Sequence, residues 1–248
     1  MRIATWNVQR PKARSWKKVP ALASCLRRIA ADVWVLTETN SVLSPGTGYA
    51  PVSSTGSDRQ QEAGESWVTI WSRLPVLAQE PTADPVRAVC AVLRQPSGRP
   101  LIVYGTVLPW LGSPWRTYPA SGGTAFEAAL RVQVADWLRL RRAYPDAALC
   151  LAGDLNQDLQ ARYYYGPEPT RGALRTAIQS AGLVPVTEGE HDPVWLRTNG
   201  ARASIDHICL CEWLMPRLRR PAQIWPDGVS PDASLSDHFG VWIDLAAA

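Results

Sequence analysis

The sequence is poor in histidine and lysine, and none of its apolar segments is long enough to span a membrane. Its first residues also lack the basic start, apolar middle and small-residue cleavage site of a secretory signal peptide, which predicts a cytoplasmic protein. The five cysteines contain no Cys-x-x-Cys pair of the kind that binds metal. They lie in apolar stretches, so we interpret them as small core residues.

Length and composition predict one large globular domain over residues 1–248, because 46% of the residues are hydrophobic and 19% are charged. The net charge of +4 permits a polyanionic partner but does not require one. Arginine carries most of the positive charge, since lysine occurs only at positions 12, 17 and 18. Arginine suits phosphate recognition, although a compositional bias of the genome is the favoured explanation.

The most informative stretch runs from Leu149 to Asp158. It begins as a short apolar segment, typical of a buried strand, stops at Gly153 and then presents Asp154 and Asn156. In extended backbone these two side chains point to the same face, where a carboxylate and an amide can orient a water molecule. A turn built from Gly, Asp and Asn explains the same residues, and this stretch alone does not decide between the two interpretations.

Two other predicted strands end in polar residues. Residues 2–8 alternate between two faces, which is typical of a strand, and Asn7 lies near its end. Residues 32–36 form an apolar run that predicts a strand buried on both faces, and Glu38 follows it. A carboxylate there is a hard oxygen ligand suited to Mg²⁺. A turn-starting asparagine and a glutamate that marks the return to solvent are the structural alternatives.

The rest of the chain supplies further strands and helices. Strands are predicted over residues 67–71, 87–93, 101–106, 203–210 and 239–245, and helices over residues 19–29, 124–142 and 173–181. Residues 41–65 form a long region with weak order signals.

Three polar residues accompany the last two predicted strands. Asp206 lies inside an apolar strand, where a carboxylate is costly unless it is paired or bound. Asp237 and His238 precede the final strand, and this pair alone is a weak signal.

Two segments are candidates for contact with nucleic acid. Residues 9–18, which include Arg10, are basic and suit contact with phosphates beside a site, but a solvated loop is the favoured interpretation. Residues 162–166 contain Tyr163 and Tyr164 close to Asn156 in sequence. Stacking of these rings on bases and packing of the loop onto the protein are about equally supported.

The order of these motifs resembles that of the endonuclease/exonuclease/phosphatase family, which includes pancreatic-type deoxyribonucleases and apurinic-site endonucleases. The matching pieces extend from the first predicted strand to the last: Thr5-Trp6-Asn7, Leu36-Thr37-Glu38, Gly153-Asp154-Leu155-Asn156, Ile205-Asp206-His207 and Ser236-Asp237-His238. Each motif is weak singly, and the five in this order are a strong signal.

The resemblance implies an α/β four-layered sandwich, in which two mixed β-sheets pack face to face with helices outside. It also implies Mg²⁺-dependent hydrolysis of a phosphoester, with Mn²⁺ as an alternative cation. By the same resemblance, the metal site contains Glu38, Asn7 and Asp237. The catalytic residues are Asp154 and Asn156, which activate and orient water, and His238, which donates to the phosphate and is oriented by Asp206. His207 is expected to be structural.

One position departs from the family pattern. The family usually has a His or Tyr donor where this chain has Val107, and neither Tyr104 nor Trp110 aligns with that position. The leading prediction is a monomeric nuclease with nucleic acid as its partner and Arg10, Tyr163 and Tyr164 as substrate contacts. The alternatives are a hydrolase of a small phosphorylated substrate and a non-catalytic phosphate or nucleic-acid binder of the same fold.

Overall fold

Two β-sheets packed face to face form the centre of the protein. The computed structural model describes residues 1–248 except 57–61, 111–112, 114–122, 163–164, 229 and 247–248. Within these described residues, the first sheet has the order β11 (Gln223–Trp225), β12 (Gly240–Asp244), β1 (Arg2–Asn7), β2 (Val33–Asn40), β4 (Glu65–Ser72), β3 (Ala50–Ser53). The second has the order β5 (Val76–Glu80), β6 (Ala88–Arg94), β7 (Pro100–Val107), β8 (Ala148–Asp154), β10 (Asp206–Cys211), β9 (Leu183–Pro185).

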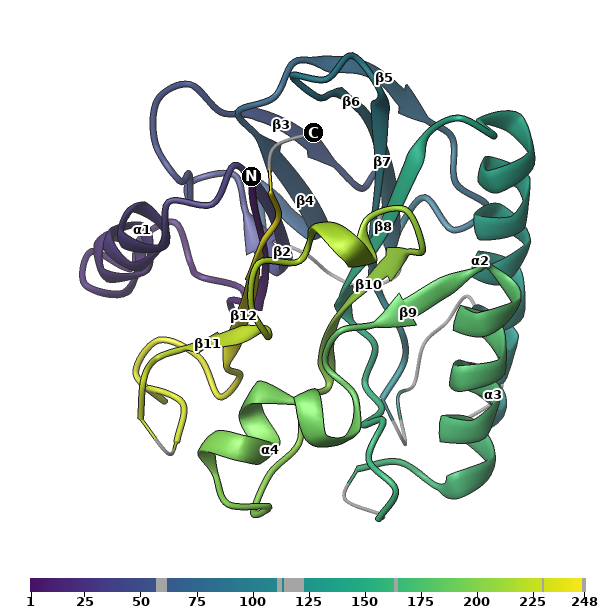
Figure 1. The fold of residues 1–248 in the computed structure, drawn as a ribbon. Helices are drawn as coiled ribbons and strands as arrows, with labels where there is room; N and C mark the ends of the chain where they lie inside the picture. Colours follow the sequence, from purple (N-terminus) through teal and green to yellow (C-terminus); the bar gives the residue numbers. More distant parts are fainter. Residues whose placement is uncertain (57–61, 111–112, 114–122, 163–164, 229, 247–248) are drawn as a thin grey trace.

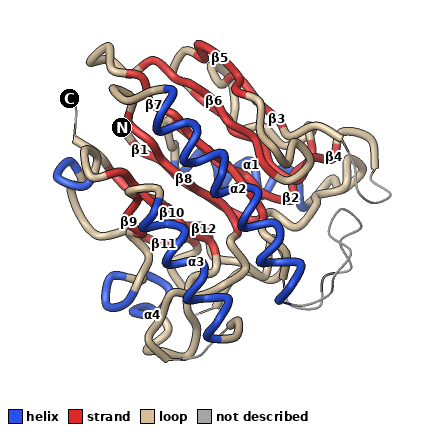
Figure 2. The backbone as a smooth tube through the Cα atoms, turned by 90° about the vertical axis from the view of Figure 1, so that its right-hand side faces the viewer, coloured by secondary structure: helices blue, strands red, loops and turns tan. Residues whose placement is uncertain are grey.

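Helices cover the outer face of each sheet. Helix α1 (Lys18–Ile29) packs on the first sheet, while α2 (Gly123–Ala143) and α3 (Glu168–Ser180) lie on the second. Figure 1 shows α1 on the left and the α2–α3 pair on the right, and Figure 2 shows α2 and α3 running in front of the second sheet. The short helix α4 (Pro193–Arg197) and the 3₁₀ turns η1 (Gly189–His191) and η2 (Met215–Arg217) lie in connections. The predicted four-layered sandwich is confirmed.

The alternation of β1 explains how one strand serves two layers. Ile3 points into the core between the sheets, whereas Ala4, Trp6 and Val8 pack with the residues of α1. On α1 the buried residues recur at helical spacing, namely Leu22, Cys25, Leu26 and Ile29. The polar residue at the end of β1 therefore lies on the face between the sheets.

Parallel pairing brings polar strand ends to one edge of the molecule. Strands β1 and β2 are parallel, with Asn7 opposite Thr37, so Glu38 is the next residue beyond that pair. Strands β7 and β8 are also parallel, with Val107 opposite Asp154. All other strand pairs among the described residues are antiparallel, so both sheets are mixed.

The two sheets pack closely around Gly105. A Cβ atom there would lie 2.9 Å from Cγ1 of Val68 and 3.0 Å from Cγ1 of Val35, both on the opposite sheet. A side chain at this position would therefore require its neighbours on the opposite sheet to shift.

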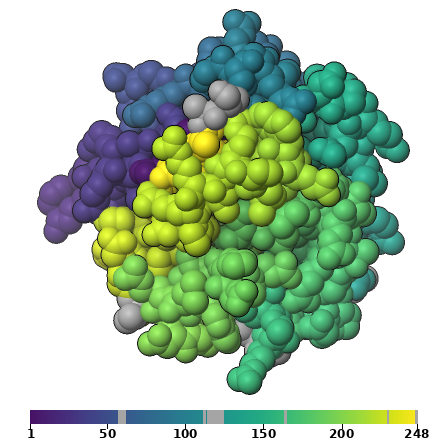
Figure 3. All heavy atoms as spheres, in the orientation of Figure 1, coloured from purple at the N-terminus to yellow at the C-terminus, as the bar shows by residue number. Residues whose placement is uncertain are grey.

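The first and last strands of the chain are neighbours, since β1 pairs with β12. Figure 3 accordingly shows yellow-green atoms of the C-terminal third between the purple N-terminal segment and the green segments.

Within the part of the chain that the structure describes, no helix has both the length and the apolarity needed to cross a lipid bilayer.

Two differences from the sequence prediction concern short or polar elements. Strand β3 lies inside the region of weak signals, because its pairing with β4 rather than its own four-residue pattern determines it. Helix α3 begins at Glu168, earlier than predicted, because Glu168 and Pro169 suit a first helical turn without contributing to the apolar stripe. The five cysteines are free and buried, as predicted.

Candidate functional site

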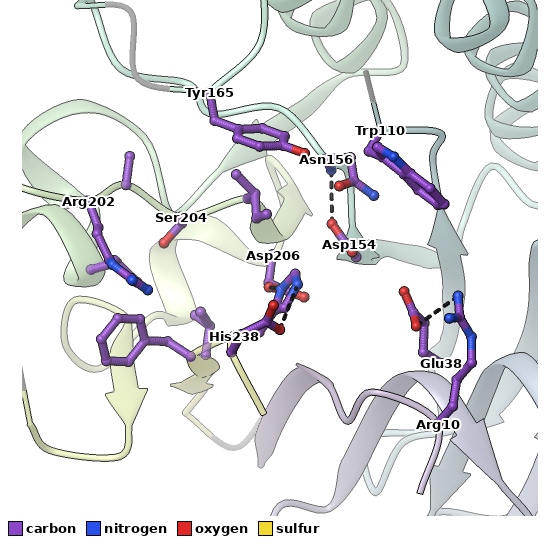
Figure 4. A pocket seen from close by; sticks show the side chains of 16 residues that line it. Arg10, Glu38, Trp110, Asp154, Asn156, Tyr165, Arg202, Ser204, Asp206 and His238 are labelled. Carbon is purple, nitrogen blue, oxygen red and sulfur yellow. Dashed lines mark hydrogen bonds and ion pairs between the residues drawn. The ribbon is translucent and has the colours of Figure 1, made fainter. Parts of the chain in front are cut away.

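The polar ends of strands from both sheets line one pocket of about 460 Å³. Glu38 extends from β2, Asp154 from the end of β8 and Asp206 from the start of β10, while His238 comes from the segment before β12. Asn7, at the end of β1, is buried and contacts Glu38 and Asp154. Figure 4 shows the side chains of Glu38, Asp154, Asp206 and His238 around the pocket. Segments far apart in the sequence therefore converge at one place.

Asn7 connects the carboxylates of the two sheets. Its amide nitrogen donates to Glu38 Oε1 at 3.3 Å and to Asp154 Oδ2 at 3.0 Å. Its amide oxygen accepts the backbone N–H of Gln9 at 3.0 Å, which fixes the orientation of the amide. The nitrogen side of Asn7 thus faces the two carboxylates and holds them close together.

His238 is paired with Asp206. Their Nδ1 and Oδ2 atoms are 2.6 Å apart. Two hydrogen bonds anchor the His238 backbone, because its carbonyl accepts from Trp6 Nε1 at 3.1 Å and its N–H donates to Ser236 Oγ at 3.1 Å. Burial by itself would lower the pKa of His238, but the charge and hydrogen bond of Asp206, with Asp154 and Asp237, raise this pKa to about 10. His238 is therefore protonated at neutral pH.

Asp154 is only 1% exposed and lies between acidic neighbours. Burial and the charge of Asp206 raise the pKa of Asp154 to about 7, against the opposing effects of His238 and Asn7. Ligand atoms of Asp154, Asp206 and His238 all lie within 4.8 Å of one another, but protonated His238 has no lone pair to offer a metal ion. Oδ1 of Asp206 is buried and has no hydrogen-bond partner among the described residues.

Asn156 is fixed beside Asp154. Its backbone N–H donates to Asp154 Oδ1 at 3.0 Å, and its side-chain nitrogen donates to the carbonyl of Leu108 at 2.8 Å. The carboxylate and the amide of this pair therefore stand side by side at the pocket wall, as Figure 4 shows. The hydrogen bond from the backbone is that of an Asx turn, so the two interpretations of this stretch are compatible.

Left-handed backbone conformations cluster around the pocket. Gln9, Arg10, Glu38 and Asn156 have φ values between 45° and 51° although none is glycine. Such conformations cost free energy and tend to collect at functional sites, where the surroundings hold them. Four of the six positive-φ residues other than glycine that are found in the described chain lie here.

The remaining predicted residues lie at the rim or outside the described residues. Arg10 forms an ion pair with Glu38 at 2.8 Å, and its guanidinium carbon lies 4.8 Å from the centroid of the Trp67 ring. The side chain of Asp237 is 64% exposed, and its Oδ1 lies 3.6 Å from His238 Nε2. Tyr163 and Tyr164 fall outside the described residues.

Sequence reasoning did not propose Arg202, Ser204 and Phe239, which also line the pocket, and it offered Tyr165 only as part of the aromatic segment 162–166. Ser204 and Phe239 lie before β10 and β12, because these strands begin later than the predicted strands over residues 203–210 and 239–245. Loop side chains follow no periodic pattern, so none of these placements could be read from the sequence.

Several other sequence expectations can be compared with the structure. Tyr104 is buried and its hydroxyl donates to Asp136, whereas Trp110 lines the pocket. His207 is buried, and its Nδ1 lies 2.6 Å from Thr187 Oγ1, in keeping with a structural role.

Comparisons with known proteins agree with this geometry. A family model described as the endonuclease/exonuclease/phosphatase family matches residues 4–238. No curated protein sequence gives a significant match. An AP endonuclease from Leishmania major has 15% sequence identity and a TM-score of 0.73 over 100% of this chain and 88% of that one.

Two further solved structures have the same fold. An AP endonuclease from Archaeoglobus fulgidus has 17% identity and a TM-score of 0.68, covering 99% of each chain. A 3′ phosphatase from Neisseria, solved with a product DNA hairpin, has 18% identity and a TM-score of 0.67, also covering 99% of each chain.

Proposed function

Because the chain belongs to the endonuclease/exonuclease/phosphatase family of metal-dependent phosphoester hydrolases, we propose that it is a nuclease that hydrolyses phosphodiester bonds in nucleic acid. The observation that carries the proposal is the convergence of Glu38, Asp154 and the Asp206–His238 pair on one pocket. We propose that residues 1–248 act as a single domain, since the strands that supply these residues extend along the whole chain.

A divalent cation fits the acidic side of the pocket. Burial and the charges of Asp206 and Glu38 raise the pKa of Asp154, so a cation at Glu38 would relieve part of this repulsion. We propose Mg²⁺, with Mn²⁺ as a substitute, at a site that contains Glu38, Asn7 and Asp237, in which the Asn7 amide nitrogen orients Glu38. When bound, the cation neutralises negative charge that grows on the phosphoryl oxygens.

The protein residues divide the remaining work among them. In the proposal, Asp154 orients the attacking water and accepts its proton, and Asn156 maintains that geometry. The pKa of about 7 for Asp154 suits a group that takes up a proton near neutral pH. His238, protonated and held by Asp206 at 2.6 Å, donates to a phosphoryl oxygen in the transition state.

A basic and aromatic segment next to the pocket supports nucleic acid as the substrate. Trp16 is 77% exposed, and the Lys17 nitrogen lies 4.8 Å from the centroid of its ring. Lys18 reaches back to the site, where burial lowers its pKa. The charges of Asp237 and Glu38 oppose this effect but do not cancel it. We propose that this segment, with Arg10, Tyr163 and Tyr164, contacts the polymer. Solved structures of the same fold include AP endonucleases and a DNA-bound 3′ phosphatase.

The same pocket favours a second candidate function. Its volume of about 460 Å³ suits a single nucleotide or a sugar phosphate, and Arg202 lines the side away from Glu38. A hydrolase of a small phosphorylated substrate would use the same carboxylates and histidine.

Incubation with a substrate panel separates the two functions. The panel contains single-stranded, duplex and abasic DNA, RNA, nucleotides and sugar phosphates, each with Mg²⁺ or with EDTA. We expect Mg²⁺-dependent cleavage of a nucleic acid by the wild-type protein and loss of that cleavage in a folded Asp154→Asn variant. Turnover of a small phosphoester without cleavage of any polymer would reject the nuclease and support the second candidate.

Salt dependence tests the role of the basic segment. We expect Lys17→Ala to weaken binding to all sequences and to reduce the slope of log K against log salt concentration by about one unit. An unchanged slope would remove Lys17 from the interface.

A monomer in the cytoplasm is part of the proposal, and the five free, buried cysteines suit a reducing compartment.

A further inference from the structure

The residues around Asp154 supply several hydrogen-bond acceptors, and the nearby amide nitrogens already have partners within the protein. Glu38, Asp154 and Asp206 present carboxylate oxygens, while the amide nitrogen of Asn7 already donates to two of these groups. The side-chain nitrogen of Asn156 donates to a backbone carbonyl. A phosphoryl group brings further negative charge, and it has more oxygens than His238 alone can reach, so a second donor from the pocket wall is needed.

Tyr165 lines this pocket opposite Glu38. Figure 4 shows its ring entering from above, with the phenol oxygen pointing toward Asn156. The phenol hydroxyl is a neutral donor, which suits an acidic pocket because it adds no further charge. Tyr165 is therefore placed where a substrate phosphoryl group beside Asp154 and Asn156 would meet its hydroxyl.

A buried polar cluster fixes the backbone of Tyr165. Its N–H donates to Asp158 Oδ2 at 2.6 Å, and its carbonyl accepts the Asp158 N–H at 3.1 Å. Asp158 is itself fully buried and lies 3.2 Å from the guanidinium of Arg171. The buried ion pair makes this local arrangement costly to disrupt, so the backbone that carries the ring is held in position before substrate arrives.

The next residue restricts the chain further. Gly166 has φ of +96°, and a Cβ atom there would lie 1.8 Å from Oε1 of Gln157. Only glycine can adopt this conformation at this distance, so the chain turns sharply directly after Tyr165. The placement of the tyrosine thus follows from packed backbone on both sides.

The neighbouring strand β7 offers no comparable group. Val107, which lies opposite Asp154 in the sheet, is a buried hydrocarbon side chain. The hydroxyl of Tyr104 on the same strand donates to Asp136, and Tyr104 does not line the pocket. Trp110 lies on the other side of Asn156 and provides the alternative donor to be tested.

We propose that Tyr165 is a catalytic residue whose hydroxyl donates a hydrogen bond to a phosphoryl oxygen of the substrate. The inference rests on the proposed function. The phenol keeps its proton throughout, and the hydrogen bond strengthens as charge develops on the oxygen in the transition state.

The test compares Tyr165→Phe with Trp110→Phe and Tyr144→Phe in the presence of Mg²⁺. Tyr144→Phe is the matched control, because it removes a hydroxyl that donates to Glu80 at a distance from the pocket. We expect Tyr165→Phe to lower kcat about 100-fold with little change in KM, while its Tm equals that of the wild type. Inhibition by orthovanadate should weaken in the same variant.

Four results would overturn the assignment. These are an unchanged kcat in Tyr165→Phe, a comparable loss in Tyr144→Phe, a loss confined to Trp110→Phe, and a fall in Tm that accompanies the loss of kcat. They leave the proposed function intact, because the wild-type protein still turns over its substrate. Absence of any Mg²⁺-dependent hydrolysis by the wild type would instead reject the proposed function together with the role of Tyr165.

Discussion

Nδ1 of His238 lies 2.6 Å from Oδ2 of Asp206, and this contact joins the two sheets at the pocket. Asp206 begins β10 of the second sheet, whereas His238 precedes β12 of the first. The pair explains how a carboxylate is tolerated at the start of an apolar strand, because its charge is matched by a protonated imidazole. It also orients the one histidine in the pocket toward the space in front of Asp154.

The raised pKa of His238 predicts a pH-dependent contribution to stability. The pKa of His238 in the folded protein, about 10, lies above its reference value of 6.5. Protonation of His238 therefore contributes its full stabilisation at pH values below 6.5. This contribution is lost as the pH rises toward 10. We expect the unfolding free energy of the wild type, measured in EDTA, to fall more steeply over this range than that of His238→Gln, by on the order of 2 kcal/mol.

Urea unfolding at several pH values measures this difference. His191→Gln is the matched control, since the His191 side chain is 71% exposed and lies outside the pocket. The control should follow the wild-type curve. Parallel curves for the wild type and His238→Gln would contradict the ion pair.

In the proposed metal site, Arg10 would compete with the cation for the carboxylate of Glu38. Its guanidinium lies 2.8 Å from Glu38 Oε2, so a metal ion that binds Glu38 must displace or share this contact. We expect Arg10→Gln to bind Mn²⁺ about threefold to tenfold more tightly than the wild type, because an attraction of about 1 kcal/mol is removed at a partly exposed site.

Isothermal titration with Mn²⁺ in the absence of substrate measures the affinity directly. Arg27→Gln is the matched control, since it removes the same charge from the exposed side of α1. Equal affinities for Arg10→Gln and Arg27→Gln would show that the Arg10 contact does not oppose metal binding.

Much of the site could be predicted from the sequence because its residues end recognisable strands. Asn7, Glu38 and Asp154 each follow an alternating or apolar run, and parallel pairing brings the ends of such runs to one edge of a sheet. The placement of Arg202, and of Tyr165 within the predicted aromatic segment 162–166, could not be predicted in this way. Their positions depend on loop conformations and on the buried ion pairs and turns that fix them, which leave no periodic pattern in the sequence.

The family resemblance implied that Asp206 orients His238, but other partners were inaccessible from the sequence. The orientation of the Asn7 amide depends on the N–H of Gln9, and no sequence pattern pairs Arg10 with Glu38. Short edge strands such as β3 and β5 were also missed, since their neighbours determine their pairing more than their own residues do.

Gly153 is predicted to be essential for the placement of Asp154. Its φ is +142°, and a Cβ atom there would lie 1.9 Å from the carbonyl oxygen of Thr106 on β7. We expect Gly153→Ala to lower the unfolding free energy by at least about 2 kcal/mol, because β7 and β8 must separate at their ends. Chemical denaturation measures the change.

The matched control is the same substitution in α3. A Cβ atom at Gly172 meets no heavy atom within 4 Å outside its own helix, so Gly172→Ala should be neutral or stabilise by up to about 1 kcal/mol. Wild-type stability for Gly153→Ala would mean that the strand ends are less closely packed than the structure indicates.

The most direct test of the account is a double-mutant cycle on kcat for cleavage of the preferred substrate in Mg²⁺. The cycle compares the wild type with Asp154→Asn, His238→Gln and the double variant, each confirmed to be folded by circular dichroism. If both side chains act on one phosphorus atom, each single variant loses about 10²- to 10⁴-fold, and the double variant loses little more than the worse single one. Independent losses that multiply in the double variant, or a single variant with wild-type kcat, would contradict a shared reaction centre.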